Sequence, residues 1–422
     1  MTFWQKLKLV ANDKSLRNRI LFVFLILAVF RLLANVPIPG VDTFRLQGFL
    51  EDNQFLGLLN LFSGGGLSAL SIVMMGTGPY ITASIIMQLL TLMSPRLKSM
   101  YHEEGSAGRL QFARYSRLLT VPLCLIQSFA LIALLQSQGV VGALTSYEKA
   151  IAMIVATAGS LFLVWLGELI SEHGTGNGVS VIIFAGIVAS VPGQIGQLLF
   201  TFDKSHLLSY LGFLLVALII IAGVVLITEA ERLLPITYAK QARAGGTMTS
   251  TSSYLPLRIN QAGVMPVIFA LSVLLFPKLL ANFFAASSHA TLQAIAAKMT
   301  WFVQSTWPYA IAYFVLVFLF TYFYTAVTFD PESVATNLQK NGAFVPGIRP
   351  GQSTTEYISK IVSRITFMGA IFLGLIAVLP VIMRQATGLQ SLAIGGTAVL
   401  IVVSVVLDIL KKIDGQVSMR QY

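Results

Sequence analysis

Charged residues are scarce in this sequence, and their scarcity is its most informative feature. Asp, Glu, Lys and Arg together make up 11% of the 422 residues, whereas 56% of the residues are apolar and the mean hydropathy is +0.79. A water-soluble domain usually carries about 25% charged residues, so this chain has too few to cover a water-facing surface. The composition therefore predicts an integral membrane protein.

The residues that build disulfides, metal sites and catalytic sites are also few. Cys124 is the single cysteine, which excludes a disulfide within the chain and a metal site made of thiolates. The four histidines follow no zinc-binding spacing: His102, His173, His206 and His289. The sequence also lacks a His-Glu-x-x-His motif, a P-loop and a nucleophile elbow. We therefore expect neither an enzyme nor a bound metal or cofactor.

Ionisable residues are missing from the middle of the apolar runs as well. The acidic residues that touch these runs, Glu168, Glu229 and Asp408, fall at predicted helix ends, where a carboxylate reaches water. Pumps and secondary transporters need ionisable groups near the bilayer midplane, as proton relays or ion ligands. The absence favours a conduit over a pump. On the residues alone, a passive conduit and a transporter of a small solute both remain open, and a membrane enzyme is a third alternative without a supporting motif.

Ten apolar runs are long enough to cross a bilayer. The hydrocarbon core is about 30 Å thick, so a helix needs roughly 20 apolar residues to span it. The predicted spans are residues 20–36, 76–94, 118–136, 150–168, 179–199, 208–228, 262–281, 308–328, 365–383 and 391–410. The first run follows a basic cluster and lacks the small-residue cleavage site of a signal peptide, so we expect it to be retained as a helix.

Lys and Arg are distributed unevenly between the loops. If the N-terminus lies in the cytoplasm, most of the 28 basic residues fall on the cytoplasmic side, where membrane proteins are enriched in them. They lie in both terminal segments and in loops 95–117, 229–261 and 329–364. This pattern predicts that both termini are cytoplasmic, and it explains the net charge of +11 without DNA as a partner.

The segment 55–75 interrupts the alternation of helix and loop. It is apolar, contains three consecutive glycines at Gly64, Gly65 and Gly66, and continues directly into the second span. An unsatisfied backbone group in lipid costs several kcal/mol, so this segment must lie inside protein or in a water-lined cavity. We expect a re-entrant half-helix. A helix lying on the outer membrane surface is the alternative.

Two cytoplasmic loops are longer than a connection between neighbouring helices requires. Loops 229–261 and 329–364 are polar and contain Gly and Pro. Loops of this kind usually bind a partner, and a purely solubilising role is the alternative.

A weak internal symmetry links two of the spans. Gly76-Thr-Gly-Pro79 enters the second span, and Gly263-Val-Met-Pro266 enters the seventh, five spans later. Because five is an odd number, two such halves are expected to be inverted relative to each other in the membrane.

Several motifs resemble the SecY/Sec61-alpha family of protein-conducting channels. The resemblance includes the stretch Asn60-Leu-Phe-Ser-Gly-Gly-Gly66 and runs in family order over most of the chain. Its segments are residues 60–66, 76–90, 176–188, 238–240, 255–260, 262–266, 341–351 and 395–397. The resemblance implies an all-α polytopic membrane protein. Ten transmembrane helices would form two inverted five-helix halves around a central pore, with a re-entrant plug half-helix.

The resemblance also implies a domain division and a function. The N-terminal half would be residues 1–200, with spans 1–5 and the plug near 55–75. The C-terminal half would be residues 201–422, with spans 6–10 and the two long loops. The channel would pass unfolded preproteins across the membrane and release hydrophobic segments into lipid.

Carried over residue by residue, the resemblance assigns candidate site residues. A pore ring would consist of Ile81, Ile85, Val179, Ile183, Ile268 and Ile401. The plug would contain Asn60, Phe62, Ser63, Gly64, Gly65 and Gly66. A lateral gate between spans two and seven would include Pro79, Ile86, Gln88, Pro266 and Leu271, with the prolines able to kink these helices. Lys240, Arg243 and Arg349 would dock a motor or a ribosome.

The spacing of the ring residues is physically reasonable. Residues 81 and 85, like 179 and 183, are i, i+4 pairs and share a helix face. An aliphatic ring offers ions no substitute for their hydration and blocks them by dewetting. For any single isoleucine among them, ordinary core packing is the alternative.

The resemblance further implies partners and a location. The partners would be SecE, SecG, the SecA ATPase, the ribosome with its RNA, signal sequences, unfolded preproteins and membrane lipid, in the bacterial cytoplasmic (inner) membrane. Two departures weaken the expected partner contacts. Glu231 and Gln241 stand where basic residues are common, and Gly108-Arg-Leu-Gln-Phe112 lacks a usual basic pair.

Overall fold

The computed structural model describes most of the chain. The described residues are 13–38, 60, 63–102, 104–137, 139, 141–142, 145–174, 176–200, 207–238, 252–263, 265–285, 289–387 and 390–419.

Each of the ten predicted spans falls on a helix. These helices are α2 (Lys14–Ala34), α5 (Gly78–Met93), α7 (Gly105–Ser137), α8 (Ser146–His173), α9 (Gly178–Phe200), α10 (Leu207–Glu229), α11 (Met265–Ala285), α13 (Thr306–Thr328), α15 (Gln352–Thr387) and α16 (Gln390–Met419). Among the described residues, three further helices lie between them: α6 (Pro95–His102), α12 (Ala290–Gln304) and α14 (Pro331–Lys340).

Length and hydropathy support a protein that crosses the membrane several times. Among the described residues, four helices are long and apolar enough to span a bilayer: Gly105–Gln136, Ser146–His173, Thr306–Lys340 and Gln352–Ile382. Three shorter apolar helical stretches are Gly178–Gly193, Leu214–Glu229 and Met265–Leu274. The count of ten spans remains a prediction.

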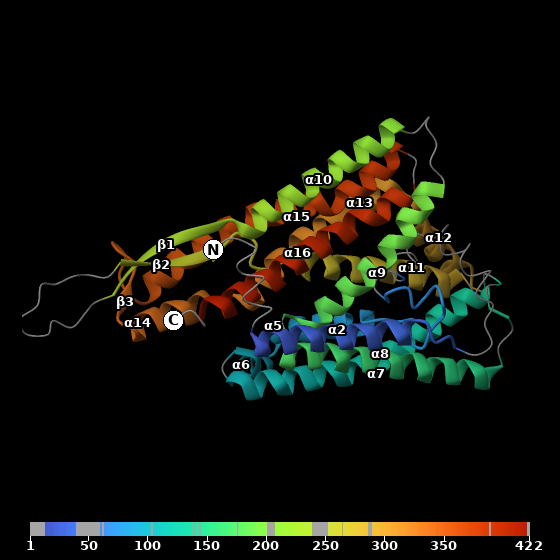
Figure 1. The fold of residues 1–422 in the computed structure, drawn as a ribbon, viewed down its shortest axis with the longest axis horizontal. Helices are drawn as coiled ribbons and strands as arrows, with labels where there is room; N and C mark the ends of the chain where they lie inside the picture. The colour runs from blue at the N-terminus through green and yellow to red at the C-terminus, as the bar shows by residue number, and fades with distance from the viewer. Residues whose placement is uncertain are drawn as a thin grey trace, which may run out of the picture.

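The helices form two groups (Figure 1). In the first group, α7 packs against α5 and α8, and α2 packs against α8. In the second group, α15 packs against α13 and α16, and α10 packs against α16. The groups meet where α9 contacts α16 and where α11 contacts α5 and α7. That these groups are inverted halves divided near residue 200 remains a prediction.

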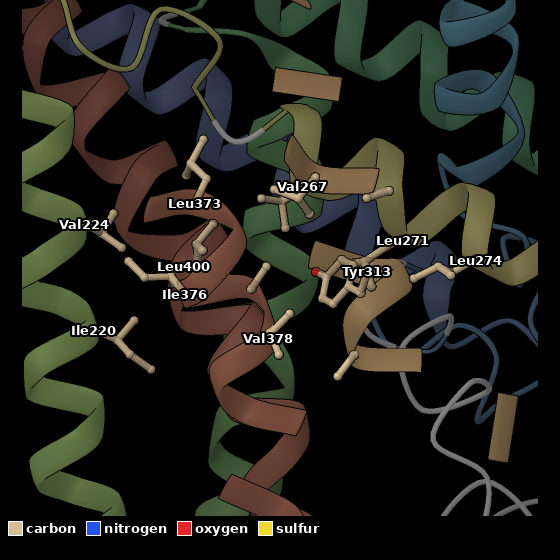
Figure 2. Close-up of a cluster of buried hydrophobic side chains, with 14 residues drawn as sticks. Ile220, Val224, Val267, Leu271, Leu274, Tyr313, Leu373, Ile376, Val378 and Leu400 are labelled. Atoms are coloured by element: carbon tan, nitrogen blue, oxygen red, sulfur yellow. The ribbon is translucent and has the colours of Figure 1, made fainter. Parts of the chain in front are cut away.

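The second group has its own buried core, which Figure 2 shows in close-up. Side chains of α10, α15 and α16, among them Ile220, Leu373 and Leu400, belong to it. On the side of α11 and α13, Leu271 lies near Tyr313, which is 1% exposed. The outward side of α10 is apolar too, since Leu214 is 59% exposed. A helix that is apolar all round is typical of a helix with protein on one side and lipid on the other.

The two long loops contain a small sheet that the sequence analysis did not anticipate. β1 (Glu231–Tyr238) pairs antiparallel with β2 (Ser252–Arg258) on one edge and with β3 (Ala343–Phe344) on the other. Leu234 and Ile236 of β1 pack against Ile358 and Ile361 of α15. The described parts of both loops therefore form one folded unit against the N-terminal part of α15.

Candidate functional site

Four helices bring the six predicted ring residues into one cluster. Ile81 and Ile85 come from α5, Val179 and Ile183 from α9, Ile268 from α11 and Ile401 from α16. The five isoleucines are at most 4% exposed, and Val179 is partly buried. Since α5 and α9 belong to one helix group and α11 and α16 to the other, the cluster lies between the groups. Its role as a pore ring stays a prediction.

The cluster is larger than the sequence analysis proposed. Ile187, Phe269 and Val405 are also buried in it. Ile187 follows Ile183 by four residues, as Ile183 follows Val179, and Val405 follows Ile401 by the same spacing. Helical periodicity was therefore the signal that could have found both.

Two glycines set the position of α9, which contributes Val179, Ile183, Phe184 and Ile187 to the cluster. A Cβ atom at Gly178 would collide with the Gly167 carbonyl oxygen of α8, and a Cβ at Gly167 would lie 3.2 Å from the Val179 N atom. Ser171 strengthens this contact, because its Oγ accepts a 2.9 Å hydrogen bond from the Gly178 N–H. The small residues let the two backbones approach closely, as at many helix contacts in membranes.

The candidate plug is compact but is not helical over residues 63–77. It forms successive turns there, with N–H to carbonyl bonds from Gly66 to Ser63, from Leu70 to Leu67 and from Met74 to Ser71. The expected half-helix is thus wrong for these residues, because Gly64 and Gly65 adopt positive φ angles of 67° and 84° that a right-handed helix excludes.

Side chains of the candidate plug form hydrogen bonds with backbone groups of the same segment. The Asn60 side-chain oxygen accepts a 2.9 Å hydrogen bond from the Ser68 N–H, and the Ser63 hydroxyl accepts one from Leu67 N–H at 3.1 Å. Leu67 is fully buried in a cluster with side chains of α7. Phe62 lies outside the described residues.

Helix α8 supports the other end of this segment. The Ser160 hydroxyl donates a 2.8 Å hydrogen bond to the Gly76 carbonyl oxygen. A Cβ at Gly159 would collide with the Ile72 carbonyl oxygen, so glycine is required for this approach. This buried and hydrogen-bonded segment therefore lies inside the protein. A helix on the outer membrane surface, the alternative, would not have these contacts.

Replacing Gly64 with alanine should destabilise this packing. The positive φ costs a residue with a Cβ about 1–2 kcal/mol, and this Cβ would also collide with the ring of Phe30. We expect the total cost to be about 1–3 kcal/mol, measured as faster maleimide labelling of a cysteine placed at the buried Leu67.

Gly139 provides the matched control for this substitution. It has a similar φ of 69°, but a Cβ there meets nothing within 4 Å. Gly139→Ala should therefore leave labelling at position 67 unchanged. Equal labelling in the Gly64→Ala and unsubstituted proteins would contradict the packing argument.

The candidate lateral gate lies where α5 contacts α11. Pro79 is in the first turn of α5, and Pro266 is the second residue of α11. In a first turn the missing N–H removes no helical hydrogen bond, so these prolines begin their helices and do not kink them. Gln88 is 8% exposed, and its side-chain carbonyl oxygen has no hydrogen-bond partner.

The pairing of Ile86 with Leu271 stays a prediction, and the packing of Leu271 does not favour it. Leu271 is 2% exposed and belongs to the core of the second helix group (Figure 2). On α11, Ile268, Phe269 and the partly buried Met265 belong to the cluster that contains Ile85. Helix α11 is apolar on both sides. The sequence pattern therefore could not show which side of α11 faces α5, that is, how the helix is rotated about its own axis.

The candidate docking residues are only partly described. Lys240 and Arg243 lie outside the described residues. The Arg349 side chain is exposed. The Arg349 backbone carbonyl oxygen accepts a 2.9 Å hydrogen bond from the Thr354 hydroxyl of α15. Glu231, one of the departures, pairs with Arg258 across the β1–β2 hairpin, with 3.3 Å between the Arg Nε and a carboxylate oxygen.

The start of α14 lies close to this unit. Burial alone would raise the pKa of the Asp330 carboxyl, but hydrogen bonds from the Ser333 side chain and the Glu332 N–H outweigh burial, and the pKa lies below its ordinary value. Asp330 thereby caps the helix as a carboxylate.

Comparisons with known proteins agree with this geometry. A sequence model of the family described as SecY matches residues 71–410. The protein translocase subunit SecY of Synechocystis sp. is 38% identical over 98% of this chain and 95% of its own length. The corresponding subunit of Streptomyces coelicolor is 39% identical over 97% of this chain and 96% of its own.

Solved structures show the same fold. One described as the structure of a protein conducting channel has a TM-score of 0.62 at 18% identity, covering 93% of this chain and 90% of its own. Sec61 in the canine ribosome–channel complex has a TM-score of 0.58 at 17% identity, with the same coverage. The family model covers most of the chain and the relatives cover nearly all of it, so the chain belongs to the SecY family.

Proposed function

We propose that this chain is the central pore subunit of a protein translocation channel. In this function it passes unfolded preproteins across the bacterial cytoplasmic membrane and releases hydrophobic segments sideways into lipid. The observation that carries the proposal is the buried aliphatic cluster that four helices build between the two helix groups. Relatives named protein translocase subunit SecY support it.

The chemistry of the cluster suits a conduit for polypeptides. Aliphatic side chains such as Ile81, Ile183 and Ile268 form no hydrogen bonds with a passing chain, so they do not select its sequence. When they close on each other, they leave no polar path for ions. The cluster performs no bond chemistry, and the channel is a passive conduit, neither an enzyme nor a cofactor-dependent protein.

The energy for transport comes from partners. SecE and SecG complete the complex, and the SecA ATPase or a ribosome pushes the preprotein from the cytoplasmic side, where both termini lie. A structural neighbour described in a ribosome–channel complex supports the ribosome as a partner. The folded unit built by β1, β2 and β3 is the proposed docking surface, with Arg349 as a cationic residue of its described part, and Lys240 and Arg243 remain docking residues on the resemblance alone.

Reconstitution tests this function directly. The chain is placed in proteoliposomes with SecE and SecG, and SecA, ATP and a radiolabelled preprotein are added. Protection of the preprotein from external protease is expected and should depend on ATP and on the signal sequence. Uptake of a small solute without preprotein protection would instead establish the transporter alternative.

Reversing the charge of Arg349 should weaken partner binding without unfolding the channel. The residue is exposed, so Arg349→Glu should cost little stability. We expect roughly three- to ten-fold weaker binding of SecA or ribosomes at low salt, and a smaller effect at high salt. Lys360→Glu, also at an exposed position, is the matched control. Unchanged affinity with lost export would contradict the docking role of Arg349.

A further inference from the structure

The last turn of α2 lies against the glycines of the candidate plug. The Arg31 Nη1 atom donates a 2.8 Å hydrogen bond to the Gly64 carbonyl oxygen. The same nitrogen would lie 3.5 Å from a Cβ at Gly65, so the guanidinium covers both glycines.

The neighbouring residue, Phe30, packs against the backbone of Gly64. Phe30 is 1% exposed, and its ring fills the space where a side chain of Gly64 would otherwise lie. Phe30 shares a buried cluster with Val73 of the plug segment and with Leu163 of α8. Successive residues of α2 therefore contact the plug in two ways, Phe30 by packing and Arg31 by a hydrogen bond.

The chain that follows α2 holds the far end of the same segment. The Ile38 N–H donates to the Leu70 carbonyl at 2.8 Å, and the Ile72 N–H donates to the Val36 carbonyl at 3.0 Å. These bonds are between backbones and are largely independent of side-chain identity. The Arg31 bond, in contrast, depends on one side chain that lies outside the plug.

We propose that Arg31 is a positioning residue that latches the plug in the closed channel. A charged donor makes a stronger hydrogen bond than a neutral one, and its acceptor here is a main-chain oxygen. Arg31 is itself exposed, so water replaces the lost bond when the plug leaves. The latch is therefore reversible. This inference rests on the proposed function, because it treats the described residues of the predicted plug near 55–75 as movable.

Labelling of a plug cysteine measures the latch. The background carries Leu67→Cys, at a position that is fully buried in the closed channel, and the native Cys124 is fully buried as well. Arg31→Gln should raise the maleimide labelling rate at position 67 about ten-fold, as expected for the loss of a hydrogen bond to a charged group. Arg31→Lys retains a charged donor and should restore most of the protection.

A second cysteine separates latching from general loosening. Leu163→Cys lies in the cluster that contains Phe30 and Val73 but is on α8, outside the plug. Its labelling rate should stay unchanged in Arg31→Gln. A parallel rise at both positions would overturn the proposal in favour of a structural role for Arg31.

Ion conductance distinguishes failure of the latch from failure of the plug. Deletion of residues 60–70 should raise the conductance of the closed channel, and Arg31→Gln should add nothing in that background. If the deletion leaks but Arg31→Gln in the full chain neither leaks nor labels faster, Arg31 is not a latch. If the deletion itself changes nothing, residues 60–70 are not a plug, and the latch is overturned with it.

Discussion

Replacing Ile81, Ile85, Ile183, Ile268 and Ile401 together with serine should make the closed channel leak ions. The five side chains are buried together in the cluster between the helix groups, and hydroxyls at these positions would admit water. A charge at the centre of a bilayer costs at least about 2.5–3.5 kcal/mol, and we expect the aliphatic cluster to impose a similar free-energy barrier on an ion. Removing that barrier should raise the ion conductance roughly one hundred-fold. Planar-bilayer recordings, with residues 60–70 present and deleted, measure this increase.

The matched control replaces the same five residues with valine. Valine keeps an aliphatic surface and removes one methylene per site, so the valine channel should stay closed to ions. If the serine channel reaches the membrane in normal amounts and conducts no more than the valine channel, the cluster is packed core and not a barrier.

A covalent link between α5 and α11 should abolish signal-sequence insertion. A cysteine at Gln88 would be paired in turn with one at Met265, Ile268 or Ser272, which lie on α11 at helical spacing. Helices in lipid associate by close contact without a hydrophobic drive, so this seam opens at modest cost when it is not linked. We expect loss of preprotein export on oxidation and full recovery with a reductant, measured in the proteoliposome assay.

Leu271 supplies the control for the cross-linking series. It lies in the core of the second helix group, so a cysteine there should not link to the one at Gln88. Links that form in the series but leave export intact would show that α5 and α11 do not part, and the gate would have to be sought at another helix contact.

Much of the fold could be predicted because it follows from one-dimensional patterns. Apolar runs of about 20 residues marked all ten long helices, and these helices differ from the predictions mainly at their ends. Helices α7 and α15 begin 13 residues before the predicted spans 118–136 and 365–383, because polar first turns continue a helix beyond the bilayer. The i, i+4 spacing of Ile81 with Ile85 and of Val179 with Ile183 similarly anticipated one shared cluster.

The rest depends on contacts between segments far apart in the chain. Prolines at 235 and 256 obscured the strands β1 and β2, which are defined by pairing with each other and with residues 343–344. The turns of the candidate plug are contacted by α2 and α8, through Phe30, Arg31 and Ser160.

The sequence by itself determined that this chain is a multi-pass membrane protein, and its motifs indicated the family. The tertiary structure decided which side of each helix packs in which cluster, as Ile268 and Leu271 of α11 show. The physical reason is that a helix between protein and lipid is apolar on every side. Hydrophobic periodicity then carries no information on rotation, and only packing against neighbouring helices sets it.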